Sequence, residues 1–256
     1  MHDLTVNPVR AFQDNYVWTL RQGNNAAVVD PGEAAPVLAY LRAHKLTLTA
    51  ILNTHHHADH VGGNAELLEH YPVPVYGPYD ERIPTVSDRV REGDTFMLPA
   101  FGIEFQVLEI PAHTRTHIAF YGGGMLFCGD TLFACGCGRL FEGTPADMHA
   151  ALTKLAQLPA ATRVYCGHEY TLSNIKFARA VEAGNAELAN LEKTAGALRA
   201  KNEATLPSTL AQELRANPFM RCSEPAVIAA ASKHAGERLT DAVSVLGALR
   251  EWKNNF

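Results

Sequence analysis

The stretch Thr54–Gly63 reads T-H-H-H-A-D-H-V-G-G and contains four of the chain's twelve histidines. One explanation is a polar surface loop or an affinity tag, although tags lie at chain ends and lack an interleaved Asp. The other is a metal site, because neutral imidazole is the commonest protein ligand for first-row metals and carboxylate is its natural partner. The spacing of the residues helps to choose between them.

His55 and His57 lie two positions apart. On an extended backbone they therefore point to the same side, while His56 points away and is free to make a structural hydrogen bond. Asp59 and His60 are adjacent and face different directions, so one short loop can supply ligands to two metals. The pattern H-x-H-x-D-H favours a metal site, but taken alone it leaves the polar loop open.

The bulk composition limits the class of protein. The 256 residues are 47% hydrophobic and 19% charged, which suits one large core or a core plus a small second domain. A formal net charge of -5 gives no general attraction to phosphate backbones, so we expect no nucleic-acid partner. No stretch approaches the roughly 20 apolar residues that span a bilayer, and no signal peptide is recognisable, so we expect no membrane association.

Five cysteines are an odd number, and none forms a C-x-x-C pair. This usage argues against a disulfide framework and favours a reducing, cytoplasmic location. We expect the thiols to be buried packing residues rather than catalysts.

Short β-rich runs alternate with turns over the first two thirds of the chain. We predict strands at 5–12, 16–22, 26–32, 48–54, 72–78 and 163–167, with several more between 95 and 128, and helices at 33–45, 64–71 and 145–159. Residues 23–25 (G-N-N) read as a hairpin turn. The histidine cluster follows the strand 48–54 directly, and the carboxyl end of a buried strand is a usual place for an α/β active site.

From about residue 169 the periodicity is helical throughout, with no strand signal. Helices are predicted at 173–184, 186–201, 210–214, 224–236 and 238–253. We therefore expect a catalytic domain at 1–168 and a helical, substrate-binding domain at 169–256.

Three further ligand-type residues, His113, Asp130 and His168, each follow a predicted strand at a Gly or Pro turn. Alone, such a His is more often a hydrogen-bonded structural residue, and an Asp in G-D-T is more often a turn or helix cap. Four strand ends of the same kind favour a common site instead.

Seven ligands suit two ions, roughly 3.5 to 4 Å apart, that hold a hydroxide formed from water. The natural division places His55, His57 and His113 on the first metal and Asp59, His60 and His168 on the second. Asp130 bridges the two. Hydrolysis is the chemistry that such a centre performs by default.

In order and context these ligands resemble those of the metallo-β-lactamase superfamily, across about residues 1–170. The longer blocks at 128–144 (CGDTLFACGCGRLFEGT), 163–178 (RVYCGHEYTLSNIKFA), 200–221 (AKNEATLPSTLAQELRANPFMR) and 250–253 (REWK) resemble glyoxalase II, the hydroxyacylglutathione hydrolase family. This second resemblance covers essentially the whole chain.

The resemblance implies an α/β fold, an αββα sandwich followed by a small all-helical domain. It implies hydrolysis of S-(2-hydroxyacyl)glutathione thioesters, chiefly S-D-lactoylglutathione, to glutathione and D-lactate, the second step of methylglyoxal detoxification. Asp59 and Asp130 would act with the metal-bridging hydroxide. We expect two divalent ions, with zinc favoured over iron or manganese, and a monomer.

The same resemblance implies that five side chains bind glutathione: Arg139, Phe141, Tyr170, Arg250 and Lys253. Arg139 stands where a Lys is usual, and Phe141 stands where a Tyr is usual. Arg139 can still bind a carboxylate or carbonyl, but Phe141 cannot donate a hydrogen bond. These departures indicate the bacterial form of the enzyme. Without the resemblance, Arg250 and Lys253 would read as solvated charges near a helix end.

Asp30, in V-V-D-P-G, ends a predicted strand and could accept a proton from a ligand imidazole. A turn Asp before Pro-Gly explains it equally well. Gly62 and Gly63 would let the backbone turn closely beneath the metals.

Two competing functions belong to the same superfamily. A glutathione persulfide dioxygenase uses one iron and would lack a complete second site, whereas Asp59, His60 and His168 are all present here. A non-catalytic metal-binding module would have lost ligands, and this sequence keeps seven candidates.

Overall fold

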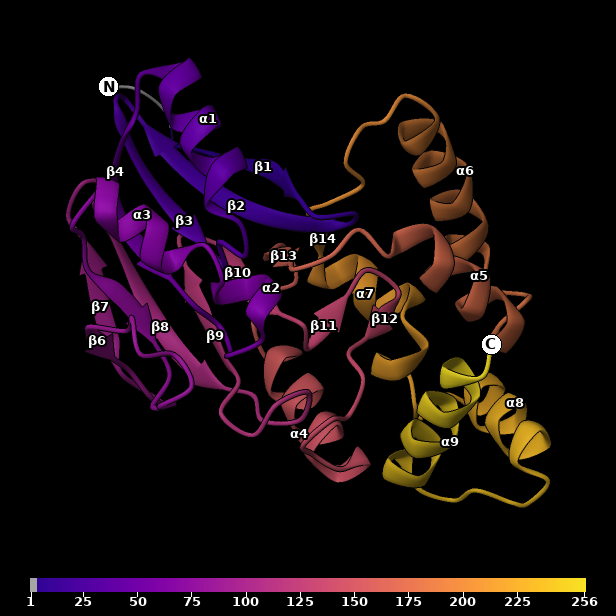
Figure 1. Cartoon of the computed structure of the whole chain (residues 1–256). Helices are drawn as coiled ribbons and strands as arrows, with labels where there is room; N and C mark the ends of the chain where they lie inside the picture. The colour runs from indigo at the N-terminus through magenta and orange to yellow at the C-terminus, as the bar shows by residue number, and fades with distance from the viewer. Residues whose placement is uncertain (1–3) are drawn as a thin grey trace. The chain divides into compact units, whose positions relative to one another are not determined.

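The computed structural model describes residues 4–256, which form two compact units. Unit 1 holds the described residues up to Glu109 together with Thr116–Gly129, and unit 2 holds Ile110–Arg115 and Asp130–Phe256. This division is not the one at residue 168 that the sequence suggests, because the segments of His113 and Asp130 belong to unit 2. Figure 1 shows the elements in chain order.

The first sheet of unit 1 contains six strands in sequence order. They are β1 (Thr5–Ala11), β2 (Asn15–Gln22), β3 (Asn25–Val29), β4 (Thr47–Leu52), β5 (Val75–Gly77) and β6 (Asp88–Arg89). The first three strands are antiparallel, and β3 to β6 run parallel. Gln22 pairs with Asn25, so the predicted hairpin turn is confirmed.

Four antiparallel strands form the second layer of unit 1. They are β7 (Thr95–Leu98), β8 (Ile103–Glu109), β9 (Ile118–Gly122) and β10 (Met125–Gly129), and each pairs with the next. The ring of Tyr76 on β5 stacks on that of Phe96 on β7, with centroids 4.1 Å apart. Phe96 also contacts Phe105 and Phe120. Unit 1 is therefore a β sandwich with an aromatic core.

Three helices belong to unit 1: α1 (Ala34–His44), α2 (Ala58–Val61) and α3 (Asn64–His70). Val37, Leu38 and Leu41 of α1, the helix predicted at 33–45, are buried in one cluster with Val9 and Val28. Full burial of such a side chain stabilises the fold by about 1.5–3 kcal/mol. The sequence predicts α1 and α3 but not the single turn α2, which is too short to show a period.

Unit 2 is mainly helical. Its helices are α4 (Pro145–Leu155), α5 (Thr171–Val181), α6 (Ala186–Ala200), α7 (Leu210–Ala216), the 3-10 turn Pro218–Met220, α8 (Pro225–Ala235) and α9 (Ala242–Asn254). Its short strands are β11 (Leu132–Phe133), β12 (Gly136–Cys137), β13 (Arg163–Cys166) and β14 (Ser208–Thr209).

The prediction that no strand follows residue 169 is wrong. Arg163 pairs with Thr209 and Val164 pairs with Ser208, so β14 extends β13 as an antiparallel partner. Two residues carry no periodicity from which a strand could be recognised.

All five cysteines are buried free thiols, which confirms their predicted role in packing. Among residues 4–256, no helix combines the length and apolar character that a bilayer crossing requires.

Candidate functional site

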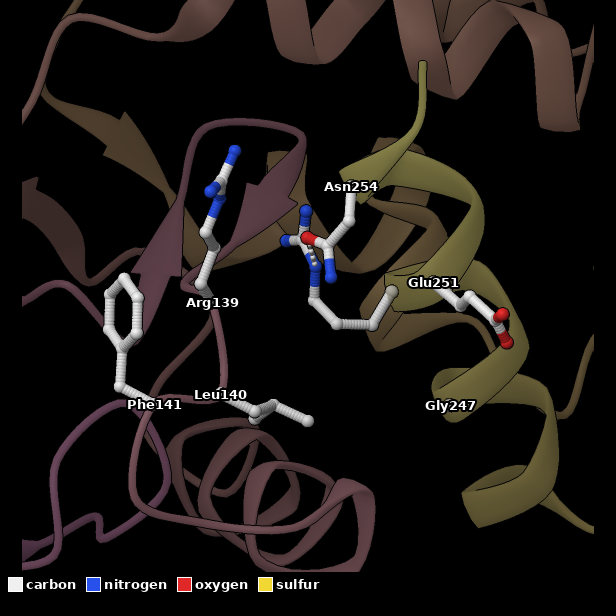
Figure 2. A pocket seen from close by; sticks show the side chains of 7 residues that line it. Arg139, Leu140, Phe141, Gly247, Glu251 and Asn254 are labelled. Atoms are coloured by element: carbon white, nitrogen blue, oxygen red, sulfur yellow. Dashed lines mark hydrogen bonds between the residues drawn. The ribbon is translucent and has the colours of Figure 1, made fainter.

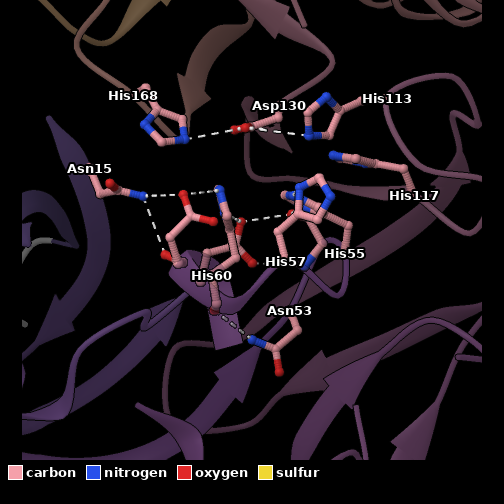
Figure 3. A network of polar contacts seen from close by, with 12 residues as sticks. Asn15, Asn53, His55, His57, His60, His113, His117, Asp130 and His168 are labelled. Atoms are coloured by element: carbon pink, nitrogen blue, oxygen red, sulfur yellow. Dashed lines mark hydrogen bonds and ion pairs between the residues drawn. The ribbon is translucent and has the colours of Figure 1, made fainter. Parts of the chain in front are cut away.

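Four of the ligand candidates lie in unit 1, where the chain leaves β4 and enters α2. His55 and His60 are 0% and 1% exposed. His57 has an extended backbone (φ -60°, ψ 142°) and precedes the first residue of α2, so Asp59 and His60 lie on a helical turn rather than on an extended loop. The side chains of His55, His57 and His60 lie together in Figure 3.

Donor atoms of these side chains converge in pairs. His55 Nε2 lies 3.1 Å from His57 Nδ1. His60 Nε2 lies 3.5 Å from the Asp59 carboxylate. Two imidazole nitrogens at this distance cannot both carry a proton facing the other, so at least one presents a lone pair.

Asp30 supports this cluster from the end of β3. Its carboxylate accepts hydrogen bonds from the backbone N–H of Thr54 at 2.8 Å and from the Thr54 hydroxyl at 2.7 Å. It also lies 3.1 Å from His60 Nδ1. A carboxylate at Nδ1 favours the tautomer protonated there, and Nε2 then carries the lone pair. Asp30 adopts φ 53°, in the left-handed region that Asp tolerates.

Two supporting residues of unit 1 are not predicted by the sequence. The Asn15 amide donates to the Asp59 carboxylate at 2.9 Å and to the Asp59 carbonyl at 3.2 Å. The His117 ring stacks on that of His55, with centroids 4.5 Å apart and planes 15° apart. His117 is fully buried, and its place in P-A-H-T-R-T-H, four residues after His113, is the one signal that could have marked it.

His56 Nδ1 lies 3.5 Å from a carboxylate oxygen of Asp80, and the His56 ring meets the His57 ring edge-on, with centroids 4.8 Å apart. Burial raises the pKa of Asp80, but hydrogen bonds from Arg82 and Thr116 outweigh it and hold that pKa well below its usual range. Asp80 therefore stays ionised and ties His56 to the second layer of the sandwich.

Glycines allow the backbone to pass close to residues 55–60, which carry the four ligand candidates of unit 1 and are called the ligand loop below. A Cβ at Gly32 would lie 1.9 Å from the Asp59 carbonyl oxygen, and a Cβ at Gly63 would lie 2.6 Å from the Pro31 carbonyl oxygen. A side chain at Gly32 would displace Asp59 in α2, and one at Gly63 would displace the backbone of residues 31–34.

The other three ligand candidates lie in unit 2. His113, Asp130 and His168 are 4%, 7% and 5% exposed. An Asp130 carboxylate oxygen lies 3.2 Å from His168 Nε2 and 3.6 Å from His113 Nε2, so one carboxylate stands between two imidazoles (Figure 3). His113 Nδ1 contacts the Arg139 carbonyl oxygen at 2.9 Å, which orients its Nε2 towards Asp130.

The donor set fits divalent metals. Each unit presents buried imidazoles together with a carboxylate, and within unit 1 donor atoms of Asp30, His55 and His60 lie within 4.8 Å of one another. Neutral imidazole and carboxylate suit zinc, iron and manganese, whereas calcium and magnesium prefer oxygen alone.

A pocket of about 370 Å³ opens in unit 2 (Figure 2). Its lining consists of Arg139, Leu140, Phe141, Gly247, Arg250, Glu251 and Asn254. Three of the five residues predicted to bind substrate, Arg139, Phe141 and Arg250, therefore line one pocket. The Phe141 ring is 63% exposed and meets the His113 ring edge-on, with centroids 5.2 Å apart. The pocket thus adjoins His113, one of the three ligand candidates of unit 2.

Arg250 is 5% exposed, so it is not the solvated charge that its sequence position alone would suggest. Its guanidinium donates to the Cys137 carbonyl oxygen at 2.7 Å and to the Asn254 side chain at 3.2 Å. It also lies over the Phe219 ring, 5.3 Å from the centroid. These contacts fix the cation at the wall of the pocket.

Lys253 lies one turn after Arg250 on α9. Burial lowers the pKa of Lys253 to about 8, and the positive charges of Arg250 and Arg139 contribute to the lowering. Arg139, Arg250 and Lys253 therefore contribute positive charge to the same part of unit 2. Tyr170 lies elsewhere in unit 2, with its ring stacked on that of His168 at 4.7 Å.

Comparison with known proteins now adds independent evidence. The family model "Metallo-beta-lactamase superfamily" matches residues 12–168, and "Hydroxyacylglutathione hydrolase C-terminus" matches residues 169–256. A hydroxyacylglutathione hydrolase of Nitrosomonas europaea is 53% identical over 99% of this chain and 97% of its own length. One of Cupriavidus taiwanensis is 56% identical over 99% of both chains. The chain belongs to the hydroxyacylglutathione hydrolase family.

Membership of the hydroxyacylglutathione hydrolase family confirms the predicted fold class, a metallo-β-lactamase sandwich with a helical C-terminal part. It also confirms that the chain is an enzyme of the thioester hydrolase class and disfavours the persulfide dioxygenase. Among solved structures, TTHA1623 in a di-iron-bound form is 29% identical, with a TM-score of 0.59 over 84% of this chain and 99% of that one. The fold and the His/Asp clusters together support a dinuclear divalent metal site.

Proposed function

We propose that this chain hydrolyses S-D-lactoylglutathione and related S-(2-hydroxyacyl)glutathiones to glutathione and the hydroxy acid. The observation that carries the proposal is that one segment of unit 2, residues 130–141, contributes to both the ligand cluster and the cationic pocket. It begins with Asp130, which stands between two imidazoles, and it ends with Arg139 and Phe141, which line the pocket. A ligand bound by its carboxylates in that pocket would therefore present its thioester beside the metal ligands.

The seven ligand candidates are assigned to two ions. His55, His57 and His113 would hold one, Asp59, His60 and His168 the other, and Asp130 both. When bound, two such ions lower the pKa of a water molecule towards neutrality and polarise a carbonyl oxygen. Zinc is our first choice of metal, and the di-iron form of TTHA1623 keeps iron as the alternative, with manganese third.

The protein's own residues orient this chemistry. The Asp30 carboxylate accepts a hydrogen bond from His60 Nδ1, and the Arg139 carbonyl oxygen accepts one from His113 Nδ1. Both contacts leave Nε2 as the nitrogen that faces its metal. Asn15 fixes the Asp59 carboxylate by donating to it.

Glutathione carries two carboxylates, which match the cations Arg139, Arg250 and Lys253. Arg139 and Arg250 present planar guanidinium groups, which bind carboxylates by paired hydrogen bonds. Phe141 offers an exposed apolar face to the glutathione backbone but no hydrogen bond. Tyr170 is assigned to the same substrate through its position beside His168.

We further propose that residues 1–168 form the catalytic domain and 169–256 the substrate domain, and that the protein acts as a cytoplasmic monomer. The bounds of the two family models support this division. Sedimentation of the purified chain would test the monomer.

The test couples elemental analysis with a thioesterase assay on the same preparation. We expect up to two metals per chain and loss of the ultraviolet thioester absorbance of S-D-lactoylglutathione. Metal-replete protein that leaves this thioester intact, or that consumes oxygen with glutathione persulfide, would overturn the assignment.

A further inference from the structure

We propose that Glu213 is a positioning residue for the glutathione half of the substrate. Its carboxylate would fix the hairpin Leu132–Cys137 and, through the hairpin, the flanking residues Asp130 and Arg139. The proposal deepens the proposed function and rests on it, since it concerns the binding of the same substrate.

Glu213 is fully buried on α7 and reaches the tip of the hairpin. Its carboxylate accepts a hydrogen bond from the Cys135 backbone N–H at 2.7 Å. Cys135 has φ 55°, a backbone conformation that a non-glycine residue rarely adopts and that is strained. A charged acceptor aimed at this N–H holds the strained tip in place.

Two amides complete the attachment of the hairpin. Asn217 Nδ2 donates to the Gly136 carbonyl at 2.9 Å, to the Phe133 carbonyl at 3.1 Å and to the Glu213 carboxylate at 3.1 Å. Asn174 Nδ2 donates to the Ala134 carbonyl at 3.0 Å. Four consecutive residues of the hairpin, 133–136, are therefore held by three buried side chains.

The partners of Glu213 differ from those expected of a stabilising ion pair. Glu182, also buried in unit 2, binds the Arg221 guanidinium through both oxygens, at 2.9 and 3.0 Å. The groups that hydrogen-bond the Glu213 carboxylate among the described residues are neutral: the Cys135 backbone N–H and the Asn217 side-chain amide. A buried carboxylate without a cation weakens the fold when it ionises, so stability alone does not explain its presence.

Burial raises the pKa of Glu213 to about 7, against the lowering effect of these hydrogen bonds. Two other titratable groups belong to this environment, the Cys135 thiol and the Glu187 carboxylate, whose charge acts on that thiol. Burial and the charges of Glu213 and Glu187 raise the pKa of the Cys135 thiol above its usual range, so it stays neutral. Glu187 of α6 is paired with Arg215 at 3.3 Å. Glu213 is therefore the group at the tip of the hairpin that changes its charge near neutral pH.

Both ends of the hairpin are coupled to its tip. Gly138 N–H donates to the Thr131 carbonyl at 3.2 Å, and a Cβ at Gly138 would lie 1.9 Å from the Asp130 carbonyl oxygen. Arg250 holds the Cys137 carbonyl. A shift at Cys135 therefore reaches the pocket wall as well as the ligand Asp130.

The experiment compares metal-replete wild type with Glu213→Gln between pH 6 and 8. The readouts are KM for S-D-lactoylglutathione and the Kd of glutathione itself, which needs no turnover. In the wild type both constants should rise about five- to tenfold as pH falls from 8 to 6, because the protonated carboxyl is a weaker acceptor. In Glu213→Gln both should stay near the wild-type low-pH value, with kcat changed less.

Glu187→Gln is the matched control, since it removes a neighbouring carboxylate that makes no bond to the hairpin; it should retain the wild-type profile. Constants for Glu213→Gln that follow those of the wild type would overturn the positioning role. A wild-type KM and Kd that do not change between pH 6 and 8 would also overturn the positioning role. This measurement on the wild type is sufficient by itself if Glu213→Gln does not fold. A wild type that binds glutathione but leaves the thioester intact would instead count against the proposed function.

Discussion

The ligand loop of unit 1 and the pocket of unit 2 are built in different ways. In unit 1, His55, His57, Asp59 and His60 follow one another within six residues, and their main support, Asp30, comes from the neighbouring strand. In unit 2 the hairpin is held by Glu213, 78 residues from Cys135, and by Arg250, 113 residues from Cys137. The ligand candidates of unit 1 are thus encoded locally, whereas the shape of the pocket depends on contacts that only the tertiary structure creates.

The two regions also differ in charge. Carboxylates support the imidazoles of the ligand loop, and cations dominate the pocket wall. Variants in the first region should therefore act on metal content and kcat, and variants in the second on KM.

Asp130→Ala should have the largest effect. The carboxylate stands between His113 and His168, and its removal takes away the ligand that we propose the two ions share. Since loss of a mere supporting residue lowers metal affinity or activity about 10- to 100-fold, loss of a ligand should lower kcat by more than about 100-fold. Steady-state thioesterase kinetics and metal analysis measure both quantities. Asp88→Ala, in the exposed strand β6, is the control, and wild-type kcat in Asp130→Ala would remove the residue from the centre.

Asp30→Asn comes next. The amide can still accept from the Thr54 N–H, but it no longer offers a negative charge to His60 Nδ1. Metal affinity should fall about 10- to 100-fold, as measured by competition with a chelator. Asp80→Asn is the control, and it tests whether the loss of any buried Asp of unit 1 lowers metal affinity. Asp80 lies beside His56, which is not a ligand candidate. Equal losses in the two variants would contradict the special role of Asp30.

The sequence predicts the local region well and the distant one poorly, for a physical reason. Ligand spacing, strand ends and the apolar face of α1 depend on residues within one or two elements, and periodicity reports them. The roles of Asn15 and Glu213 depend on partners 44 and 78 residues away, and nothing in their neighbourhood marks them. Strands β6 and β14 have two residues each and gain their structure from pairing alone.

The resemblance to a family predicts substrate-binding residues, which periodicity cannot identify. Arg139, Phe141 and Arg250 are named by it, and they do line one pocket of unit 2. It does not indicate that Arg250 is buried or that it bonds the hairpin. A variant at Arg250 would therefore remove two interactions at once: the proposed contact with the substrate, and the hydrogen bond that the guanidinium donates to the Cys137 carbonyl.

Arg250→Ala combined with Lys253→Ala should raise KM about tenfold or more while kcat changes less. Hydrogen bonds to charged groups contribute about 1.5–3 kcal/mol, and every 1.4 kcal/mol is tenfold in binding. Lys193→Ala on α6, which removes an exposed cation of the same unit, should leave KM unchanged. An unchanged KM in the double variant would exclude both residues from substrate binding and leave Arg250 a structural role only.

The smallest expected effect is a pH dependence set by Lys253. Because its pKa is lowered to about 8, the ammonium is charged below pH 8 and neutral above it. KM should therefore rise between pH 7.5 and 9, by up to about fivefold, as one partner of the substrate carboxylates loses its charge. Lys253→Met should remove this rise and show the higher KM throughout, while ionisation of the substrate's own amino group affects both proteins alike. Parallel profiles for the two proteins would show that the charge of Lys253 takes no part in binding, and the pocket would then depend on the two arginines.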